Sequence, residues 1–145
     1  MFSENTISIL KANGWNEDRL IDISNFEKYF EKNGLLLYNK AKSFLQRFGG
    51  IDFRFLIPLN KSTYHFYFNP ISIGIHDLKT YVEDTEIECG KKLLPIGEFD
   101  NRNMTCFMDE EGRVYSSSDT EIELFANSGE EFIEYICTRF KGKSI

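Results

Sequence analysis

Residues 93–115 constrain this chain most, because they predict three short strands joined by tight turns. Two apolar runs, Leu93–Ile96 and Met104–Met108, are followed by the turn Asp109–Gly112 and by a third short β-like segment. Gly112 can take the positive φ that the last position of a short hairpin loop requires. We therefore expect an antiparallel meander at the centre of a sheet. Three of its residues are expected in the core: Ile96, Phe107 and Val114.

Four other segments carry apolar residues at helical spacing, with a glycine or a polar cap at one end. They are residues 4–13, 24–33, 39–48 and 128–140. Ser24 and Ser128 each precede a glutamate by three positions, which is the pattern of a capping box. Residues 77–84 could add one or two helical turns.

Aromatic-rich or alternating runs predict further strands at residues 51–57, 64–68 and 121–125, and a short β-like run at 20–23. Helices followed by strands and then by a helix are typical of the α+β class. A length of 145 residues fits one compact domain. We therefore predict a single α+β domain over residues 1–145, with a central antiparallel sheet flanked by N-terminal helices and a C-terminal helix.

The composition limits the class of protein. Hydrophobic residues make up 41% of the chain and aromatic residues 15%, which excludes an intrinsically disordered protein. Cys89, Cys106 and Cys137 are odd in number and widely spaced, so neither a disulfide framework nor a zinc site is indicated. The first residues do not resemble a signal peptide, and no apolar run approaches the length of a membrane span. We expect a cytoplasmic protein with reduced thiols.

A search for catalytic or cofactor-binding motifs gives no match. The sequence contains no nucleophile elbow, phosphate-binding loop or dinucleotide-binding pattern, and His65 and His76 do not have the spacing of metal ligands. Cys106 lies in an apolar run, which is typical of an inert core thiol. We therefore expect no enzyme, no cofactor and no metal. A hydrolase that uses the neighbouring carboxylates Glu98 and Asp100 is a distant alternative.

The charge of the chain argues for a protein partner. The net charge of -6 and the pI near 5.0 disfavour direct binding to nucleic acid. The acidity is concentrated, because residues 81–131 hold 14 of the 23 acidic residues and only 4 of the 17 basic ones. Such a concentration speeds the encounter with a cationic partner. An ordinary solvated acidic face explains the same pattern about equally well.

Seven short motifs occur along nearly the whole chain in a recognisable order. They are Gly14–Trp15 with Arg19, Asp22–Ser24, Phe44–Leu45 before Phe48–Gly50, Phe68–Pro70, Leu94–Glu98, Asp109 with Gly112–Tyr115, and the closing segment Ser128–Phe140. Each motif alone is only a cap, a turn or a core segment. Taken together and in this order, the chain resembles the SUKH superfamily of bacterial immunity proteins, and its third family most closely.

This resemblance implies a non-enzymatic antitoxin that binds and neutralises a toxin domain, often a nuclease. A nuclease presents a basic substrate groove, which an acidic surface can cover. We therefore predict that carboxylates around the central meander face the partner, with Tyr81 as an exposed aromatic anchor. The predicted residues are Glu83, Asp84, Glu86, Glu98, Asp100, Asp119 and Glu121. The alternative is a cytosolic module of the same fold that binds a protein or peptide unrelated to toxins.

Overall fold

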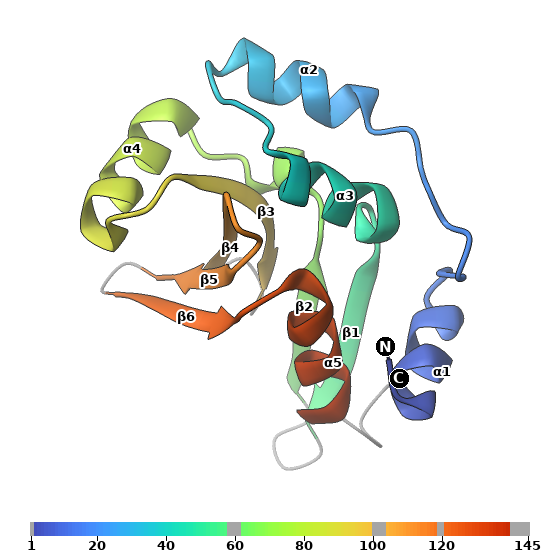
Figure 1. The fold of residues 1–145 in the computed structure, drawn as a ribbon. Helices are drawn as coiled ribbons and strands as arrows, with labels where there is room; N and C mark the ends of the chain where they lie inside the picture. Colours follow the sequence, from blue (N-terminus) through green and yellow to red (C-terminus); the bar gives the residue numbers. More distant parts are fainter. Residues whose placement is uncertain (1, 58–61, 100–103, 119–120, 140–145) are drawn as a thin grey trace.

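The computed structural model describes residues 2–57, 62–99, 104–118 and 121–139. Its strands form one antiparallel sheet in the order β1-β2-β3-β4-β5-β6 (Figure 1). The strands are β1 Asp52–Ile57, β2 Ser62–Tyr67, β3 Leu93–Phe99, β4 Met104–Asp109, β5 Val114–Ser117 and β6 Ile122–Ala126. The helices are α1 Glu4–Ala12, α2 Ser24–Lys32, α3 Asn39–Phe48, the short 3₁₀ helix η1 Pro70–Ile73, α4 Leu78–Cys89 and α5 Gly129–Arg139. The predicted α+β domain is confirmed.

The two faces of the sheet pack into two separate apolar clusters. Along β4, Cys106 and Met108 join the main core, which also includes residues of α1, α2, α3 and α5. Phe107 points to the other face, where it packs with Leu78 and Val82 of α4. Period-2 alternation therefore lets one strand support helices on both sides. All seven residues of β3 are buried, and the three predicted core residues are confirmed as fully buried: Ile96, Phe107 and Val114.

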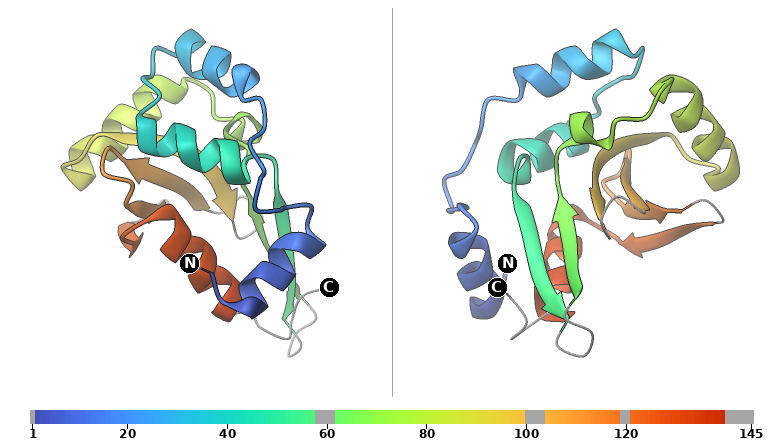
Figure 2. Two further views of the ribbon diagram at one scale, coloured as in Figure 1. Left: turned by 45° about the vertical axis from the view of Figure 1, so that its right-hand side comes forward. Right: turned by 180° about the vertical axis from the view of Figure 1, so that it is seen from behind.

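The helices cover different parts of the curled sheet. Helices α3 and α5 lie against the face that carries the main core, and α1 packs on α5 (Figures 1 and 2). Helix α4 covers the opposite face near β3, β4 and β5. Leu93 of β3, Phe107 of β4 and Tyr115 of β5 together hold α4 on this face.

The sequence motif nearest the N-terminus, Gly14–Trp15 with Arg19, holds the loop after α1 against α3. The Arg19 guanidinium donates hydrogen bonds of 2.7 Å to the carbonyl oxygens of Arg47 and Gly49, at the C-terminal end of α3. The Trp15 ring stacks on Phe48, with a centroid separation of 6.2 Å and an interplanar angle of 6°. Arg19 therefore satisfies carbonyl groups at the end of α3, and Trp15 contributes its ring to the main core.

Two local predictions near residue 22 are wrong. Residues 20–23 form no strand; Leu20 is exposed, and the Ile21 amide donates to the carbonyl of Gln46. Ser24 does not cap α2, because its hydroxyl and amide both donate to the Asp22 carboxylate, at 2.7 and 2.9 Å. In a capping box the Ser24 amide would donate to the Glu27 carboxylate. Here the Asp22 carboxylate accepts from that amide, and the Glu27 amide donates to the Ile23 carbonyl, so Ile23 takes the cap position.

The five predicted helices are all present, and the cap of α5 and the length of α4 differ in detail from the prediction. At α5, the Glu131 amide donates to the Ser128 hydroxyl at 3.0 Å, as a capping box requires. The Glu131 carboxylate accepts from the amide of Asn127 at 3.1 Å, one residue before the Ser128 amide that the pattern predicts. Helix α4 is longer than the one or two turns expected. It continues to Cys89 because Val82 and Thr85 stay buried, and it ends where Gly90 takes a left-handed conformation.

Candidate partner-binding surface

Helix α4 carries the densest group of the predicted acidic residues. Its inner side is fixed by the buried residues Leu78, Val82 and Thr85, which recur at helical spacing and pack toward the sheet. Its N-terminus is capped by Asp77, whose carboxylate accepts hydrogen bonds from the Thr80 amide at 3.4 Å and from the Thr80 hydroxyl at 2.9 Å. With the inner side fixed, the outer side presents carboxylates to solvent. Glu83 and Asp84 are exposed there, as is Glu88.

Glu86 lies at the edge of this helix and has a structural contact. One of its carboxylate oxygens accepts a 2.9 Å hydrogen bond from the Leu93 amide, which ties α4 to the start of β3. The charge of Glu86 also acts on Tyr38. Burial raises the pKa of the Tyr38 phenol to about 12, and the nearby charges of Glu86 and Glu110 add to the effect. Glu86 therefore has a structural role, because one of its carboxylate oxygens is already hydrogen-bonded within the fold.

Two hollows adjoin the outer side of α4. The first, of about 250 Å³, lies between α4 and the loop that joins α2 to α3. The second, of about 400 Å³, lies at the C-terminal end of α4 and is more open. Both are walled by Glu83, Glu86 and Lys92. The large exposed side chains Leu36 and Ile87 line the first and the second hollow, respectively.

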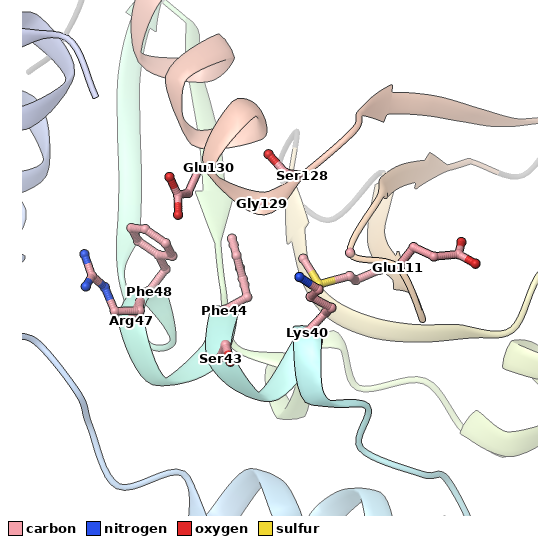
Figure 3. Close-up of a pocket in the computed structure, with 11 residues that line it drawn as sticks. Lys40, Ser43, Phe44, Arg47, Phe48, Glu111, Ser128, Gly129 and Glu130 are labelled. Atoms are coloured by element: carbon pink, nitrogen blue, oxygen red, sulfur yellow. The ribbon is translucent and has the colours of Figure 1, made fainter. Parts of the chain in front are cut away.

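A third cavity, of about 240 Å³, lies among α3, the β4–β5 turn and the start of α5 (Figure 3). Phe44, Phe48 and Met108 line it, and charged side chains of both signs surround it, including Lys40 and Glu111. A Cβ atom on Gly129 would lie 2.5 Å from the Phe44 ring, so glycine is required for α5 to start so close to α3. This cavity contains no pairing of a nucleophile with a base.

Two other kinds of feature are absent from the described part of the chain. No group of three or more His, Cys, Asp or Glu side chains in it is placed to hold a metal ion. Among the same residues, no helix is both long enough and apolar enough to cross a membrane.

Comparison with known protein families decides the identity of the fold. A family model described as SUKH-3 immunity protein matches residues 2–139. The chain belongs to the SUKH-3 immunity protein family. Family membership makes it a non-enzymatic protein and implies the neutralisation of a toxin. No curated protein matches the chain.

In this SUKH-3 protein, the predicted acidic residues do not form one surface. Glu98 is only 2% exposed; it lies inside β3, paired with Tyr67 of β2 and Thr105 of β4. Its prediction as a partner-facing residue is therefore corrected, because its carboxylate is an internal group. Glu121 is exposed just before β6. Asp100 and Asp119 lie outside the described residues.

Tyr81 also has a different role from the one expected. Its ring packs on Phe107 with a centroid separation of 5.8 Å, and its hydroxyl donates to the Thr105 hydroxyl at 3.2 Å. The side chain is half-buried, so Tyr81 helps to fix α4 on the sheet of this SUKH-3 protein and is not the exposed anchor that the sequence suggested.

The exposed apolar residues of this SUKH-3 protein were missed by the sequence interpretation. A signal for Ile87 was present, because Ile87 follows Leu78 by nine residues, which is half a rotation around a helix that turns 100° per residue. Its exposure follows from the burial of Leu78 once the helix is known to reach Cys89. Leu36 lies between Leu35 and Leu37 in a loop, where no periodicity predicts which side chain points outward.

Proposed function

We propose that this SUKH-3 protein neutralises a cognate toxin domain by direct contact between a basic surface of the toxin and the outer face of α4. We call this face the α4 surface and define it by Leu36, Glu83, Asp84, Glu86 and Ile87. Glu121 would extend the acidic region, and Asp100 and Asp119 remain predicted members.

The observation that carries the proposal is the uncompensated charge of α4. The helix contains four carboxylates and one lysine. Within the part of the chain that the structure describes, Glu83, Asp84 and Glu88 form no ion pair, whereas Glu17, Glu27 and Asp109 each have a basic partner. Lys79 lies on this helix and Lys91 and Lys92 follow it, but exposed carboxylates that form no ion pair remain available to a cationic partner.

A nuclease is the kind of toxin that this charge fits best. Nucleases must hold a phosphate backbone and therefore present lysine and arginine side chains in their substrate groove. An acidic helix can occupy or cover such a groove, and electrostatic steering speeds the encounter before the toxin reaches its substrate. Neutralisation in this form needs no chemistry from the immunity protein.

The test is binding to the toxin domain encoded beside this protein's gene. We expect the double variant Glu83→Lys/Asp84→Lys to weaken binding by about tenfold or more at low salt, with a smaller salt dependence than the wild type. The matched control is Glu4→Lys/Asp18→Lys, which makes the same change in net charge around α1, away from α4 in Figure 1. Both control residues are exposed.

The outcomes separate the alternatives. Equal affinity of the α4 variant and the wild type at low salt would contradict the acidic surface. Failure of the wild type to bind the neighbouring toxin would favour a binding module with an unrelated partner. Loss of binding by the control as well would show that net charge matters and its position does not.

A further inference from the structure

Two apolar side chains project from the α4 surface into solvent. Ile87 is 82% exposed and Leu36 is 78% exposed, more than any other large hydrophobic side chain that the structure describes. Ile87 lies on the side of α4 opposite Leu78, which is buried. Leu36 projects from the loop between α2 and α3, whereas its neighbours Leu35 and Leu37 pack against the core. Single exposed apolar residues are common, so the argument depends on the position of the pair.

Leu36 and Ile87 line two hollows that adjoin the same part of α4. Leu36 lines the hollow between α4 and the α2–α3 loop, and Ile87 lines the hollow at the C-terminal end of α4. The two hollows share Glu83, Glu86 and Lys92 as lining residues, so charged side chains of both signs lie between Leu36 and Ile87 (Figure 1 shows α4 beside the loop). A concave, partly apolar surface of this kind can bind side chains of a partner.

The charges at these hollows are mixed. The first is lined by Glu83, Glu86 and Glu110 together with Lys79 and Lys92, and the second has two carboxylates and two lysines. Local charge alone therefore gives a partner little net attraction at this point. In protein interfaces, a desolvated apolar centre carries most of the affinity, and the charged rim sets orientation and association rate.

We propose that Leu36 and Ile87 are the affinity-determining anchors of the α4 surface, and that they contact apolar side chains set among basic residues on the toxin domain. This inference rests on the proposed function, since it specifies the chemistry of the same partner. Charge complementarity favours this occupant outside the hollows, because the exposed carboxylates Glu83 and Asp84 lie on the same helix as Ile87 and form no ion pair within the described part of the chain. Lys79 and Lys92, which line the hollows, would disfavour partners that place basic groups inside them.

The cavity of Figure 3 does not offer the same contact. Its apolar wall is made of Phe44, Phe48 and Met108, which are 5%, 3% and 1% exposed, so none of these side chains projects from it. The α4 surface is therefore the better candidate for an anchored contact.

The experiment measures association and dissociation rates of the cognate toxin domain with Leu36→Ser, Ile87→Ser and the double variant. The control is Leu20→Ser, because Leu20 is 70% exposed and precedes α2, on a different part of the surface. We expect the double variant to raise Kd by about 10- to 100-fold, mainly through faster dissociation, with an unchanged salt dependence. Thermal unfolding should confirm that all the variants fold, since exposed positions affect stability little.

The results also separate this inference from the proposed function. A double variant whose Kd stays within about twofold of the wild type would overturn the anchor pair, even if the charge variants of α4 weaken binding. A large effect of Leu36→Ser/Ile87→Ser with no effect of Glu83→Lys/Asp84→Lys would support the anchors and overturn the acidic surface. A wild-type protein that does not bind the toxin would overturn both.

Discussion

The Glu134 carboxylate on α5 accepts a 2.7 Å hydrogen bond from the hydroxyl of Thr6 on α1, a residue 128 positions earlier in the chain. The same carboxylate accepts hydrogen bonds from the Ser3 amide at 2.7 Å and from the Thr138 hydroxyl at 2.7 Å. Burial alone would raise the pKa of Glu134, but the hydrogen bonds outweigh it and lower the pKa to about 2. One ionised side chain thus joins the first and last helices.

Glu134→Gln should destabilise the protein by about 1–2 kcal/mol at neutral pH, because hydrogen bonds to a charged acceptor are lost. A carboxyl group with a lowered pKa in the folded state stabilises the fold above its ordinary pKa, near 4.5, and this contribution is lost as the pH falls toward about 2. The difference in the free energy of unfolding between variant and wild type should therefore shrink below pH 4.5. Urea unfolding at several pH values measures it.

The control for Glu134 is Glu130→Gln, an exposed carboxylate on the preceding turn of α5. Its effect should be at most a few tenths of a kcal/mol, from the interaction with the helix dipole. A Glu134→Gln penalty that stays constant from neutral pH to pH 2.5 would contradict the role given to the ionised carboxylate.

Gly97→Ala should destabilise the protein by about 3 kcal/mol, because the strands at this point leave no room for a side chain. A Cβ atom at Gly97 would lie 2.5 Å from the carbonyl oxygen of Tyr67 and 2.9 Å from the Cα atom of Phe68, and backbone cannot move aside as a side chain can. The matched variant is Gly90→Ala. No atom lies within 4 Å of a Cβ there, but φ is +76°, so only the backbone conformation costs energy, about 1–2 kcal/mol. Equal losses in chemical denaturation would contradict the steric argument.

Much of the fold could be predicted because its signals are local. The strands of residues 93–115 and the glycine of the β4–β5 turn follow from alternation and turn chemistry, and the structure has them close to the expected positions. Helix α2 shows the limit of local signals. Ser24 matches a capping pattern, but Asp22 accepts the amide hydrogen bond that a capping box would give to Glu27, and this choice depends on the path of the loop after α1.

The candidate site was harder to predict because exposure depends on contacts distant in sequence. Glu98 is charged and adjoins a turn-like motif, yet it is buried where β2 and β4 flank β3. Tyr81 is covered only because α4 packs on Phe107, and Leu36 projects only because the residues on either side of it turn inward. Net charge along the sequence identified the acidic region, but it could not distinguish the members that face solvent.

Glu98→Lys should unfold the protein or destabilise it by about 3 kcal/mol or more, because it places an opposite charge at a buried position. Glu83→Lys on the exposed side of α4 should change the free energy of unfolding by no more than about 0.5 kcal/mol. Thermal and urea unfolding of both variants, without any toxin, makes the comparison. A Glu98→Lys protein as stable as the wild type would show that this side chain reaches water.

Tyr115→Phe should cost about 1–2 kcal/mol, because the Tyr115 hydroxyl donates a 3.0 Å hydrogen bond to the buried Asp109 carboxylate at the β4–β5 turn. Tyr135→Phe is the control, since that ring is 40% exposed. Burial, aided by the hydrogen bond to Asp109, raises the pKa of Tyr115 to about 12. The stabilisation should therefore be complete below pH 10 and be lost as the pH rises toward 12. An ultraviolet titration in which Tyr115→Phe removes a group that ionises near pH 10 would contradict this.

The three cysteines should differ sharply in reactivity toward a maleimide. Burial raises the pKa of Cys106, with a further contribution from the charge of Glu98, and burial raises the pKa of Cys137 to about 12. Both side chains are fully buried, whereas Cys89 at the end of α4 is partly exposed. The pKa of Cys89 is also raised by burial, so it should react slowly, but it should be the one cysteine that reacts in the folded protein. Mass spectrometry should find a single label on the native chain, three after denaturation, and none on native Cys89→Ser. Labelling of native Cys89→Ser at a wild-type rate would mean that the sheet or α5 opens far more often than this packing allows.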